Sequence, residues 1–451
     1  MKKIYFKIII ILSCLFLLDI STKKQINIHV YIDPATTPAL LQITDFIKQP
    51  KDDFKIISWK RYQIKNQEAY PNTLFVNTKT NQRFSPHDDF KHVKDDTLLF
   101  LIKDKIKTAQ KENSKVKLHV HFNMQHPYYY FLLKNHPETK DKIASIHAYE
   151  DSSGRFYWDN DPNDILLNSP VKPHLYYWEG IDQLCQKNST QQKCVKIQNT
   201  LKNVIPISVN FEKLSSKLSE QEKNMIFKIT GFDYQKIKNM FSGKNSHVYI
   251  LGYDYRNPII GAQLSNLRQL CQTEEKTEND IWFYKNHPNG MYWPSHEALN
   301  HLCPGIKPLE AHLPFELLAL SGFHPKKVAG YSSSVFLNIN SESILSYLER
   351  KDDPYLDILK QTKQIIDKKI ITPEQQETLL QKNGIYLFLD KSHDDDIQNW
   401  YLKINPNTFL NIFTAEKISI LKETKNEFTI QYPKDKTTIF KRQEGYRFSN
   451  K

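Results

Sequence analysis

Segments with the pattern of β-strands alternate with amphipathic, helix-like segments along most of the chain. In the first half, this pattern predicts strands at 27–33, 54–59, 73–77, 116–122 and 143–149. It predicts helices at 38–47 and 95–110. Such alternation is typical of a parallel sheet covered by helices, because neighbouring parallel strands need a crossover connection. We therefore predict an open α/β domain over residues 25–204.

The same pattern resumes in the second half of the chain. Polar, helix-compatible stretches at 187–203 and 212–223 are followed by predicted strands at 248–252 and 281–285. Helix-like segments lie between and after these strands. We predict a second α/β domain over residues 205–393.

The end of the chain, residues 394–451, has a different pattern. Its apolar runs are short and polar turns separate them, at 409–413, 418–421, 428–432 and 437–440. Short strands joined by turns are typical of antiparallel sheets. We predict a small β-rich tail of unknown role.

Composition limits the class of protein. Of the 451 residues, 39% are apolar and 12% are aromatic, which is enough for buried cores and unlike a disordered chain. Lys and Arg number 62 against 50 Asp and Glu, which gives a net charge of +12. The basic residues are spread along the chain, so the charge fits anionic partners in general and does not specifically indicate nucleic acid.

The N-terminal segment has the character of a targeting element. Lys2, Lys3 and Lys7 precede an apolar run at 8–18. About 7 to 15 apolar residues are typical of a signal-peptide core, whereas a membrane-spanning helix needs roughly 20. We expect residues 1–24 to be a signal peptide or membrane anchor, and the protein to be membrane-associated or exported.

The cysteines beyond this segment are even in number: Cys185, Cys194, Cys271 and Cys303. In an exported protein they could form two disulfides. The local choice among three connectivities pairs Cys185 with Cys194 and Cys271 with Cys303. Buried or free thiols explain the same residues equally well.

Neither common Gly-rich phosphate loop is present. No two of the 12 glycines are separated by one residue, which excludes G-x-G-x-x-G, and G-K-[ST] is absent. Ser332, Ser333 and Ser334 follow a short predicted strand and Gly330. A helix beginning there would offer its free N–H groups to a phosphate, although a plain Ser N-cap is the simpler interpretation.

Two more polar clusters follow predicted strands, where ligands bind in α/β folds. Glu150 and Asp151 precede two serines, and a carboxylate at such a place can act as a general base. Lys285 and His287 stand in a turn after an apolar strand. Taken alone, each cluster is more often a structural turn than a site.

No metal site is expected from the sequence. His296 and His301 form H-E-x-x-x-H, which is one residue too long for the zinc-binding helix motif. His119 and His121 share one strand face and His126 follows, but no carboxylate or cysteine accompanies them locally. We interpret these histidines as polar residues that line a cleft.

Seven short motifs occur in an order that resembles one family. They lie at 32–40 (IDPATTPAL), 58–61 (SWKR), 118–126 (LHVHFNMQH), 149–153 (YEDSS), 284–288 (YKNHP), 315–316 (FE) and 333–334 (SS). Together they resemble the bacterial sialyltransferases of glycosyltransferase family 80. The resemblance runs from about 27 to 390 and is weak between 155 and 225. It implies the GT-B fold, in which two Rossmann-like domains face a cleft.

The resemblance also implies roles for individual residues. Asp151 would deprotonate the acceptor hydroxyl, and His287 would assist departure of the nucleotide phosphate. The nucleotide-sugar site would contain Ser153 at the sialic-acid carboxylate, Glu316 at the ribose hydroxyls, Ser333 and Ser334 at the phosphate, Lys285 and Pro288 at the cytosine side, and also Gly252 and Phe315. The acceptor side would contain Arg61, His126 and Arg256.

A protein of this family would move sialic acid from CMP-sialic acid to a galactose-terminated glycan or glycolipid by an inverting single displacement. It would need no cofactor and no obligatory metal. Its setting would be lipooligosaccharide or capsule glycan biosynthesis in a Gram-negative bacterium. Two alternatives stay open: another GT-B nucleotide-sugar transferase, and a non-catalytic exported carbohydrate-binding protein.

The chain departs from the family pattern in places that affect the site. Ser152 stands where Gly is usual after the acidic pair, and Asn286 stands where Gly is usual before His287. At 253–256 the chain has Y-D-Y-R, where the family has a Thr-rich turn and a Trp on the acceptor side. The sequence therefore leaves the acceptor and the linkage open.

Overall fold

The computed structural model describes residues 24–450 except 63, 65, 78–95, 152–164, 167, 189, 253–258, 274–278, 288–292, 312, 352, 364, 366, 391–398 and 434–435. Residues 1–23 of the predicted targeting segment, and the predicted site residues Ser153, Arg256 and Pro288, lie outside the described residues. Within the described part of the chain, no helix combines the length and the apolar character that a bilayer-spanning segment needs.

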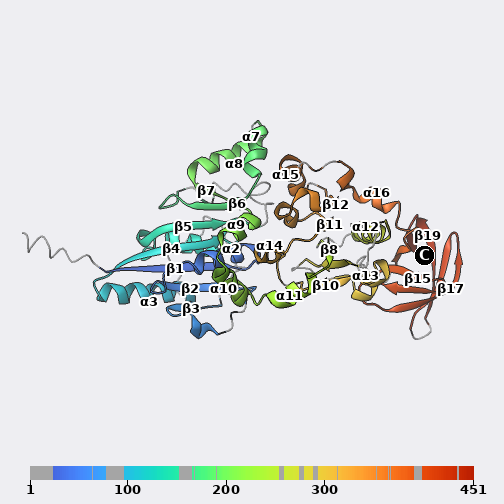
Figure 1. Cartoon of the computed structure of the whole chain (residues 1–451), viewed down its shortest axis with the longest axis horizontal. Coiled ribbons are helices and arrows are strands. Elements are labelled where there is room, and N and C mark those ends of the chain that lie inside the picture. The colour runs from blue at the N-terminus through green and yellow to red at the C-terminus, as the bar shows by residue number, and fades with distance from the viewer. Residues whose placement is uncertain are drawn as a thin grey trace, which may run out of the picture.

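The first domain is built on a seven-stranded sheet with the order β3-β2-β1-β4-β5-β6-β7, in which all neighbours are parallel (Figure 1). Its strands are β1 (Gln25–Asp33), β2 (Phe54–Trp59), β3 (Thr73–Phe75), β4 (Lys115–Asn123), β5 (Ile143–Tyr149), β6 (His174–Trp178) and β7 (Ile205–Val209). The sequence pattern predicts the first five and misses β6 and β7. The predicted parallel α/β architecture is confirmed.

Strand β7 corrects the predicted domain boundary at residue 205. It pairs in parallel with β6, so residues 205–209 complete the first sheet and do not start the second domain. It is an edge strand that contains Pro206, and Ile205 is 40% exposed. An edge strand need not have the continuous apolar run of a buried parallel strand, which is why the pattern missed it.

Helices cover both faces of the first sheet. They include α2 (Thr37–Phe46), α3 (Thr97–Lys111) and α4 (Tyr128–Asn135). On one face, the Tyr31 hydroxyl of β1 donates a hydrogen bond to Asp45 of α2 at 2.7 Å. On the other face, Tyr130 of α4 stacks on Phe122 of β4 with ring centroids 4.5 Å apart. Side chains alternate between the faces along each strand, so each strand contributes to both helix layers.

The second domain is built on a six-stranded parallel sheet with the order β10-β9-β8-β11-β12-β13. Its strands are β8 (Asn245–Ile250), β9 (Asp280–Lys285), β10 (Lys307–Leu309), β11 (Lys327–Tyr331), β12 (Ile344–Leu348) and β13 (Ile370–Ile371). Its helices include α12 (Ile259–Thr273), α13 (His296–Leu302), α14 (Glu316–Ser321), α15 (Pro354–Thr362) and α16 (Pro373–Glu377). Strand β11 ends at Tyr331, directly before the three serines at 332–334.

The segment of the chain between β6 and β8 forms five helices among its described residues. They are α7 (Ile181–Lys187), α8 (Gln192–Asn203), α9 (Phe211–Lys217), α10 (Glu220–Thr230) and α11 (Tyr234–Phe241). Helix α7 contacts α15, α9 contacts α14, and α10 contacts α2. The Ser215 hydroxyl of α9 donates to the Leu320 carbonyl of α14 at 2.9 Å. Apolar residues of both sheets therefore form one continuous core.

The helix predicted at 212–223 is wrong as a single element, because the chain breaks between α9 and α10 at Leu218. Ser219 starts α10 with a capping box: its hydroxyl accepts from the Glu222 N–H, and the Glu222 carboxylate accepts from the Ser219 N–H. This reciprocal pair satisfies two N–H groups of the first turn, so a new helix start is favoured over a continuous helix.

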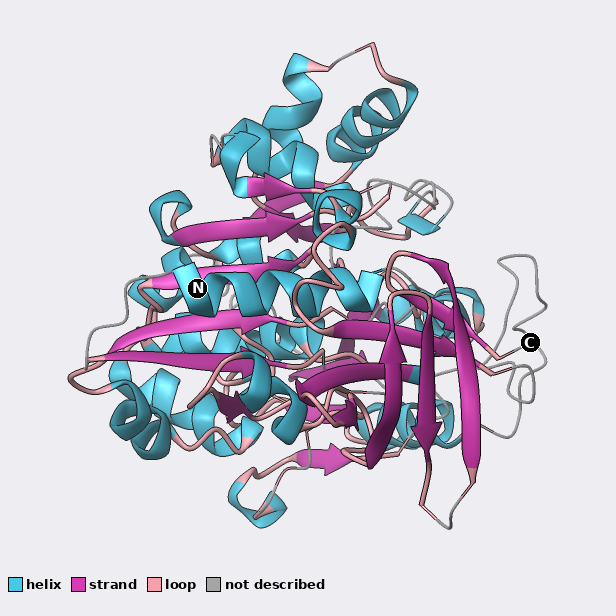
Figure 2. Ribbon diagram, turned by 90° about the vertical axis from the view of Figure 1, so that its right-hand side faces the viewer, coloured by secondary structure: helices cyan, strands magenta, loops and turns pink. Residues whose placement is uncertain are grey.

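The C-terminal residues form a closed barrel of β14 (Ile385–Leu389), β15 (Trp400–Asn405), β16 (Thr408–Asn411), β17 (Lys417–Thr424), β18 (Glu427–Gln431), β19 (Thr437–Glu444) and β20 (Arg447–Ser449) (Figure 2). Neighbours are antiparallel except β14 and β20, which are parallel and close the barrel. Aromatic and aliphatic side chains, including Phe388, Phe409 and Phe428, fill its interior. The β-rich tail is therefore present, but it begins at Ile385 and not at the predicted residue 394.

The barrel packs on the second sheet and shares a core with it. Trp400 of β15 lies against Gly261 of α12, where a Cβ would fall 2.6 Å from the indole ring. The Ser295 N–H donates to the Ile412 carbonyl at 2.7 Å, next to the start of α13. Figure 1 shows the barrel at the opposite end of the molecule from the first sheet.

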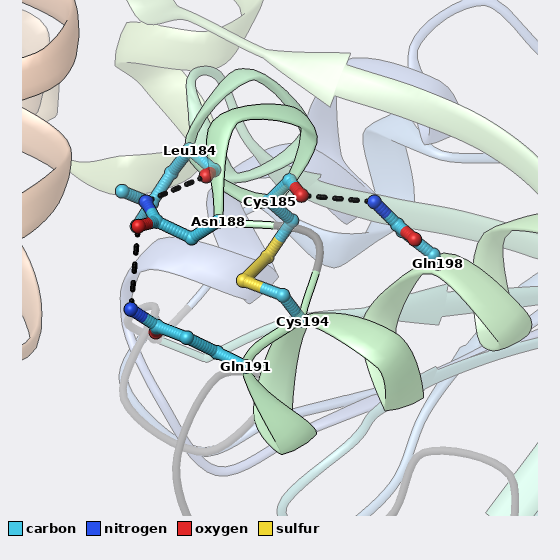
Figure 3. The surroundings of a disulfide bond; sticks show 6 residues. All are labelled: Leu184, Cys185, Asn188, Gln191, Cys194 and Gln198. Atoms are coloured by element: carbon cyan, nitrogen blue, oxygen red, sulfur yellow. Dashed lines mark hydrogen bonds between the residues drawn. A yellow bond between two sulfur atoms is a disulfide. The ribbon is translucent and has the colours of Figure 1, made fainter.

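Two disulfides are present, and both follow the local pairing. Cys185 of α7 bonds to Cys194 of α8 (Figure 3). Close by, the Gln198 side chain donates to the Cys185 carbonyl at 2.8 Å. Cys271 of α12 bonds to Cys303, directly after α13. Each disulfide thus joins consecutive helices of its own domain region.

Candidate active site

The carboxyl ends of β1, β4 and β5 bring three polar residues together in the first domain. The Asn123 amide, at the end of β4, donates to Asp33 Oδ1 at 3.1 Å and to Asp151 Oδ2 at 3.3 Å. Asp33 ends β1, and Asp151 follows β5 by two residues. Because parallel strands end at the same edge of a sheet, these three side chains converge there.

Gln125 fixes the same loop from a second direction. Its side-chain amide donates to the Asp151 carbonyl at 2.8 Å, and its backbone N–H donates to Asn123 Oδ1 at 2.8 Å. The predicted acceptor residue His126 follows, and its N–H donates to the Asn123 carbonyl at 2.9 Å. Both the backbone and the carboxylate of Asp151 are thus held by residues of the turn after β4.

Asp33 is fully buried beside this carboxylate. Burial and the nearby charge of Asp151 raise the pKa of Asp33 well above its ordinary value, and the hydrogen bonds from Ala35 and Asn123 only partly offset this. Two carboxyl groups that are close together do not readily ionise at once. Of these two residues, Asp33 therefore favours its neutral, protonated form.

The second domain contributes Lys285 and Glu316. The ammonium of Lys285, at the end of β9, donates to the carbonyls of Asn286 and Ala311, both at 2.8 Å. Burial lowers the pKa of Lys285 to about 8, although Glu316 opposes this shift. Glu316 is the first residue of α14, and only 3% of it is exposed. Phe315 is the residue that caps this helix.

Electrostatic interactions link residues of the first domain with residues of the second. Burial raises the pKa of Glu316, the Lys285 ammonium opposes this, and the Asp151 carboxylate adds to it. Burial, Glu316 and Asp33 together raise the pKa of Tyr62 well above its ordinary value. Tyr62 follows β2 in the first domain, so it lies within electrostatic range of carboxyl groups from both domains.

His287 lies at the same meeting point. Burial lowers its pKa to about 4, with further contributions from the charges of Lys285 and Arg61. Arg61 comes from the first domain and Lys285 from the second, so His287 is within electrostatic range of both. The imidazole is neutral at pH 7, and a neutral imidazole still has one N–H to donate. An anion bound beside it would favour its protonated form.

The paired serines follow β11, as predicted, but the element they begin is not an α-helix. Ser333 caps a 3₁₀ helix, η4 (Ser334–Asn338), and its hydroxyl oxygen accepts from the Val335 N–H at 3.3 Å. The Ser N-cap interpretation is therefore correct for Ser333. A hydroxyl that accepts in this way retains its own proton to donate.

Gly252 lies two residues after β8 and closes the same edge of the second sheet. Its N–H donates to the Gln263 side chain at 2.9 Å. A Cβ at this position would fall 2.0 Å from a ring carbon of Tyr331, the last residue of β11. Only glycine fits between β8 and Tyr331 without displacing the serine turn.

Hydrogen bonds join Asp151 to Asn123 and Gln125, and electrostatic interactions relate Asp151 to Glu316. Gly252 and the paired serines lie after strands of the second sheet. Four further polar residues lie among the first-domain groups, and the sequence did not single them out. Asp33, Tyr62, Asn123 and Gln125 were given no role. Asp33 and Asn123 do carry a recognisable signal, since each is a polar residue that ends a buried parallel strand. Tyr62 and Gln125 lie in loops, where no periodicity marks them.

Comparison with known proteins supports an enzyme. Residues 186–355 match the family model described as "Sialyltransferase PMO188". The fold matches an α/β-galactoside α-2,3-sialyltransferase from Photobacterium phosphoreum with a TM-score of 0.59 and 16% identity, over 78% of this chain and 99% of that chain. The family match covers less than half of the chain, and the structural likeness at 16% identity shows the fold. No curated protein sequence matches the chain.

Two other solved structures share the fold of this chain. The Photobacterium damsela sialyltransferase matches with a TM-score of 0.55 and 15% identity, over 77% of this chain and 81% of that one. The 2,6-sialyltransferase of Photobacterium sp. JT-ISH-224, solved with CMP and lactose, matches with a TM-score of 0.55 and 16% identity, over 77% and 78%. The predicted fold class is therefore confirmed.

The matched segment lies mostly in the second domain and also includes α8 and β7 of the first. It contains Lys285, His287, Glu316 and the paired serines, whereas Asp151 lies before it. The first-domain residues Asp33, Asn123 and Asp151 lie outside the matched range, and the fold brings them together.

Proposed function

We propose that the chain transfers sialic acid from CMP-sialic acid to a galactoside acceptor by an inverting single displacement. The observation that carries this proposal is Asp151, held by Asn123 and Gln125 within electrostatic range of Glu316 in the family-matched segment. A structure of the same fold was solved with CMP and lactose, a galactoside, which supports the two substrate classes.

In this mechanism Asp151 removes the proton of the acceptor hydroxyl as that oxygen attacks the anomeric carbon. The bond from sialic acid to phosphate breaks through an oxocarbenium-like state, so a general base and stabilisation of the leaving phosphate are sufficient. No covalent nucleophile is needed. The Asn123 amide donates to Asp151 Oδ2 and so orients the carboxylate that accepts the proton.

The leaving phosphate is bound by His287, Ser333 and Ser334. The charge of the phosphate favours the protonated imidazole, which offsets the burial that lowers the pKa of His287 in the chain alone. The serine hydroxyls donate to the phosphate oxygens. Because these groups supply the charge compensation, activity needs no metal and persists after exhaustive treatment with EDTA.

The remaining assignments rest on the family resemblance, and Ser153, Arg256 and Pro288 lie outside the described residues. Glu316 binds the ribose hydroxyls, and Lys285 with Pro288 lies at the cytosine side. Gly252 and Phe315 shape the donor site, and Ser153 meets the sialic-acid carboxylate. Arg61, His126 and Arg256 face the acceptor. The chain is similar in fold to both an α-2,3- and a 2,6-sialyltransferase, so the fold does not determine the linkage. In this proposal the acceptor residues determine it.

We also propose that the protein is membrane-associated or exported in a Gram-negative bacterium and acts in lipooligosaccharide or capsule biosynthesis. The two disulfides support this location, because disulfides persist in oxidising compartments and are rare in the cytosol. The apolar run near the N-terminus agrees with it.

The test measures CMP release and products by mass spectrometry, with CMP-sialic acid and a panel of galactosides. Asp151→Asn should lower kcat on the order of 10²- to 10⁴-fold and leave CMP affinity nearly unchanged, since a general base acts in the transition state. Asp104→Asn, on the exposed side of α3, is the matched control and should keep full activity. Full turnover by Asp151→Asn, or transfer from a different nucleotide sugar, would overturn the proposal.

A further inference from the structure

One face of the first sheet carries a row of stacked rings. His29 of β1 stacks on His119 of β4 with centroids 4.5 Å apart. Next to them, Tyr31 stacks on His121 at 4.2 Å, and His121 stacks on His147 at 4.3 Å. Neighbouring parallel strands in this register place these residues side by side. The row ends two residues before Asp33 and Asn123, so it lies next to the candidate active site without being part of it.

Helix α2 adds a carboxylate to this row. One ring nitrogen each of His29 and His121 and one carboxylate oxygen of Asp45 lie within 4.8 Å of one another. His121 Nε2 is 3.7 Å from Asp45 Oδ2. The sequence analysis found no carboxylate near the histidines, because Asp45 is far from His121 along the chain and the fold brings it there.

Each histidine of this trio has one nitrogen bonded and the other unpartnered. His29 Nε2 lies 3.2 Å from Asp53 Oδ2, whereas His29 Nδ1 is buried with no hydrogen-bond partner. His121 Nδ1 lies 3.0 Å from the Tyr149 hydroxyl, whereas His121 Nε2 is buried with no partner. His29 is only 5% exposed and His121 only 1%, so water does not readily supply the missing partner.

The bonded nitrogens orient the unpartnered ones in the way that metal sites require. A ligating histidine usually donates its other N–H to a carboxylate or another oxygen, which fixes the tautomer and the ring. Asp53 and Tyr149 are such acceptors here. The ligating oxygen is oriented too, because Asp45 Oδ2 accepts from the Tyr31 hydroxyl at 2.7 Å and from Gln49 at 3.0 Å.

We propose that His29, Asp45 and His121 form a binding site for a divalent transition-metal ion of the zinc class. Imidazole and carboxylate are ligands that such ions prefer, and three protein ligands leave a position for water. Ligand atoms about 2.0–2.1 Å from one ion lie roughly 3.4 Å apart. The His121–Asp45 pair, at 3.7 Å, is close to this spacing, and all three ligand atoms lie within 4.8 Å of one another, so small movements of the His29 ring and of α2 complete the site.

The role of this site is structural. Asp45 is on α2 whereas the two histidines are on β1 and β4, so the ion joins the helix to the two central strands. It takes no part in the transfer chemistry, which is assigned to groups at the strand ends. Asp45 is partly exposed, with 22% of its side chain accessible, and this gives the ion a way in from solvent.

The experiment uses the full-length protein after removal of metals with EDTA. Zn²⁺ binding is measured by calorimetry, and Co²⁺ serves as a probe whose visible absorption reports ligation by protein groups. We expect one ion per chain and a rise in Tm when Zn²⁺ is added, because an ion that binds only the folded state stabilises it. Absence of stoichiometric binding would overturn the site.

Variants separate this site from the rest of the histidine row. Asp45→Asn and His29→Gln should each weaken Zn²⁺ binding at least about tenfold and remove the Tm rise, because each deletes one ligand. His174→Gln is the matched control, since His174 stacks on His147 at 4.6 Å but is in no such group of ligands among the described residues. Circular dichroism verifies that each variant is folded. If either variant is unfolded, Asp45→Ser is measured in its place, with the same expected loss of binding. Binding that survives the loss of Asp45, or that is lost in His174→Gln, would overturn the assignment.

Discussion

Asn123 stands between two carboxyl groups that would otherwise meet directly. Its amide donates to Asp33 and to Asp151, while its own oxygen accepts from the Gln125 N–H. A residue that donates two hydrogen bonds to carboxyl groups both orients them and reduces their repulsion. In the proposed mechanism Asn123 is therefore a positioning residue for Asp151.

Asn123→Ala should lower kcat by about 10- to 10²-fold and leave CMP affinity unchanged, because misplacing a catalytic group costs the transition state and not the bound nucleotide. It should also change the pH profile of kcat, since Asp151 loses a hydrogen bond that favours its charged form. Steady-state kinetics over a pH series and calorimetry with CMP measure both effects. Asn203→Ala, on the exposed end of α8, is the control. An unchanged kcat and pH profile would show that Asn123 does not position the base.

His287 gives a pH dependence with a definite sign. Its pKa is lowered to about 4, whereas the unfolded chain has the ordinary value of about 6.5. The unfolded state therefore takes up this proton first as the pH falls, and the stability that the neutral imidazole contributes above pH 6.5 is lost towards pH 4. His287→Gln should gain Tm relative to the unmodified protein over this range. A constant difference in Tm from pH 7 to 4 would contradict a buried, neutral His287.

At the scale of elements, Gly330 decides how β8 and β11 approach each other. Its φ of +133° lies where side chains are rarely tolerated, and a Cβ there would fall 2.2 Å from the Ile250 carbonyl oxygen. The neighbouring atom is backbone, so it cannot move aside as a side chain can. The short approach places the serine turn after β11 next to the end of β8.

Gly330→Ala should therefore lower Tm and weaken CMP binding, because the strands must separate and the serine turn moves with them. Gly305→Ala is the control: Gly305 also has a positive φ, +82°, but open space surrounds its Cβ position. It should lose only the roughly 1–2 kcal/mol of a left-handed backbone conformation and keep its affinity for CMP. Thermal melts and calorimetry compare the two variants. Equal losses in both would mean that the contact with Ile250 is unimportant.

Elements with strong periodicity could be predicted from the sequence, and those without it could not. The predicted bounds 54–59 and 143–149 agree with β2 and β5, because both are central, apolar and flanked by polar turns. The edge strand β7 and the two-residue β13 carry too little apolar pattern to be recognised. At the site, strand-end residues were predictable by position, but the pairing of Asp33 with Asp151 and the contribution of Asp45 to the histidines depend on long-range packing that no local pattern encodes.

At the scale of the whole molecule, three cores follow one another: one shared by the two sheets, one between the second sheet and the barrel, and one inside the barrel. Each disulfide lies beside a different part of this arrangement. Cys185–Cys194 closes a separation of 9 residues beside the first sheet, and Cys271–Cys303 closes one of 32 residues beside the barrel contact. A longer closed loop removes more entropy from the unfolded chain. The second disulfide should therefore contribute more to stability.

Replacing Cys271 and Cys303 with Ala should cost about 1 kcal/mol more stability than replacing Cys185 and Cys194, from the dependence of loop entropy on length. Thermal melts of the two double variants, each compared with the unmodified protein under reducing and non-reducing conditions, measure this difference. The reducing agent should lower the Tm of the unmodified protein most. A larger loss from the Cys185–Cys194 pair would contradict the entropic argument.

The barrel shares a core with the second sheet and lies at the end of the molecule away from the first sheet (Figure 1). Any rotation of the second sheet about the interdomain contact therefore swings the barrel through a wider arc than it moves the cleft. The displacement produced by a rotation grows with distance from the axis. A small change of angle that barely moves His287 therefore displaces β17 by a larger, measurable distance. A fluorescent pair placed on β17 and on α3 would thus report domain rotation directly in solution.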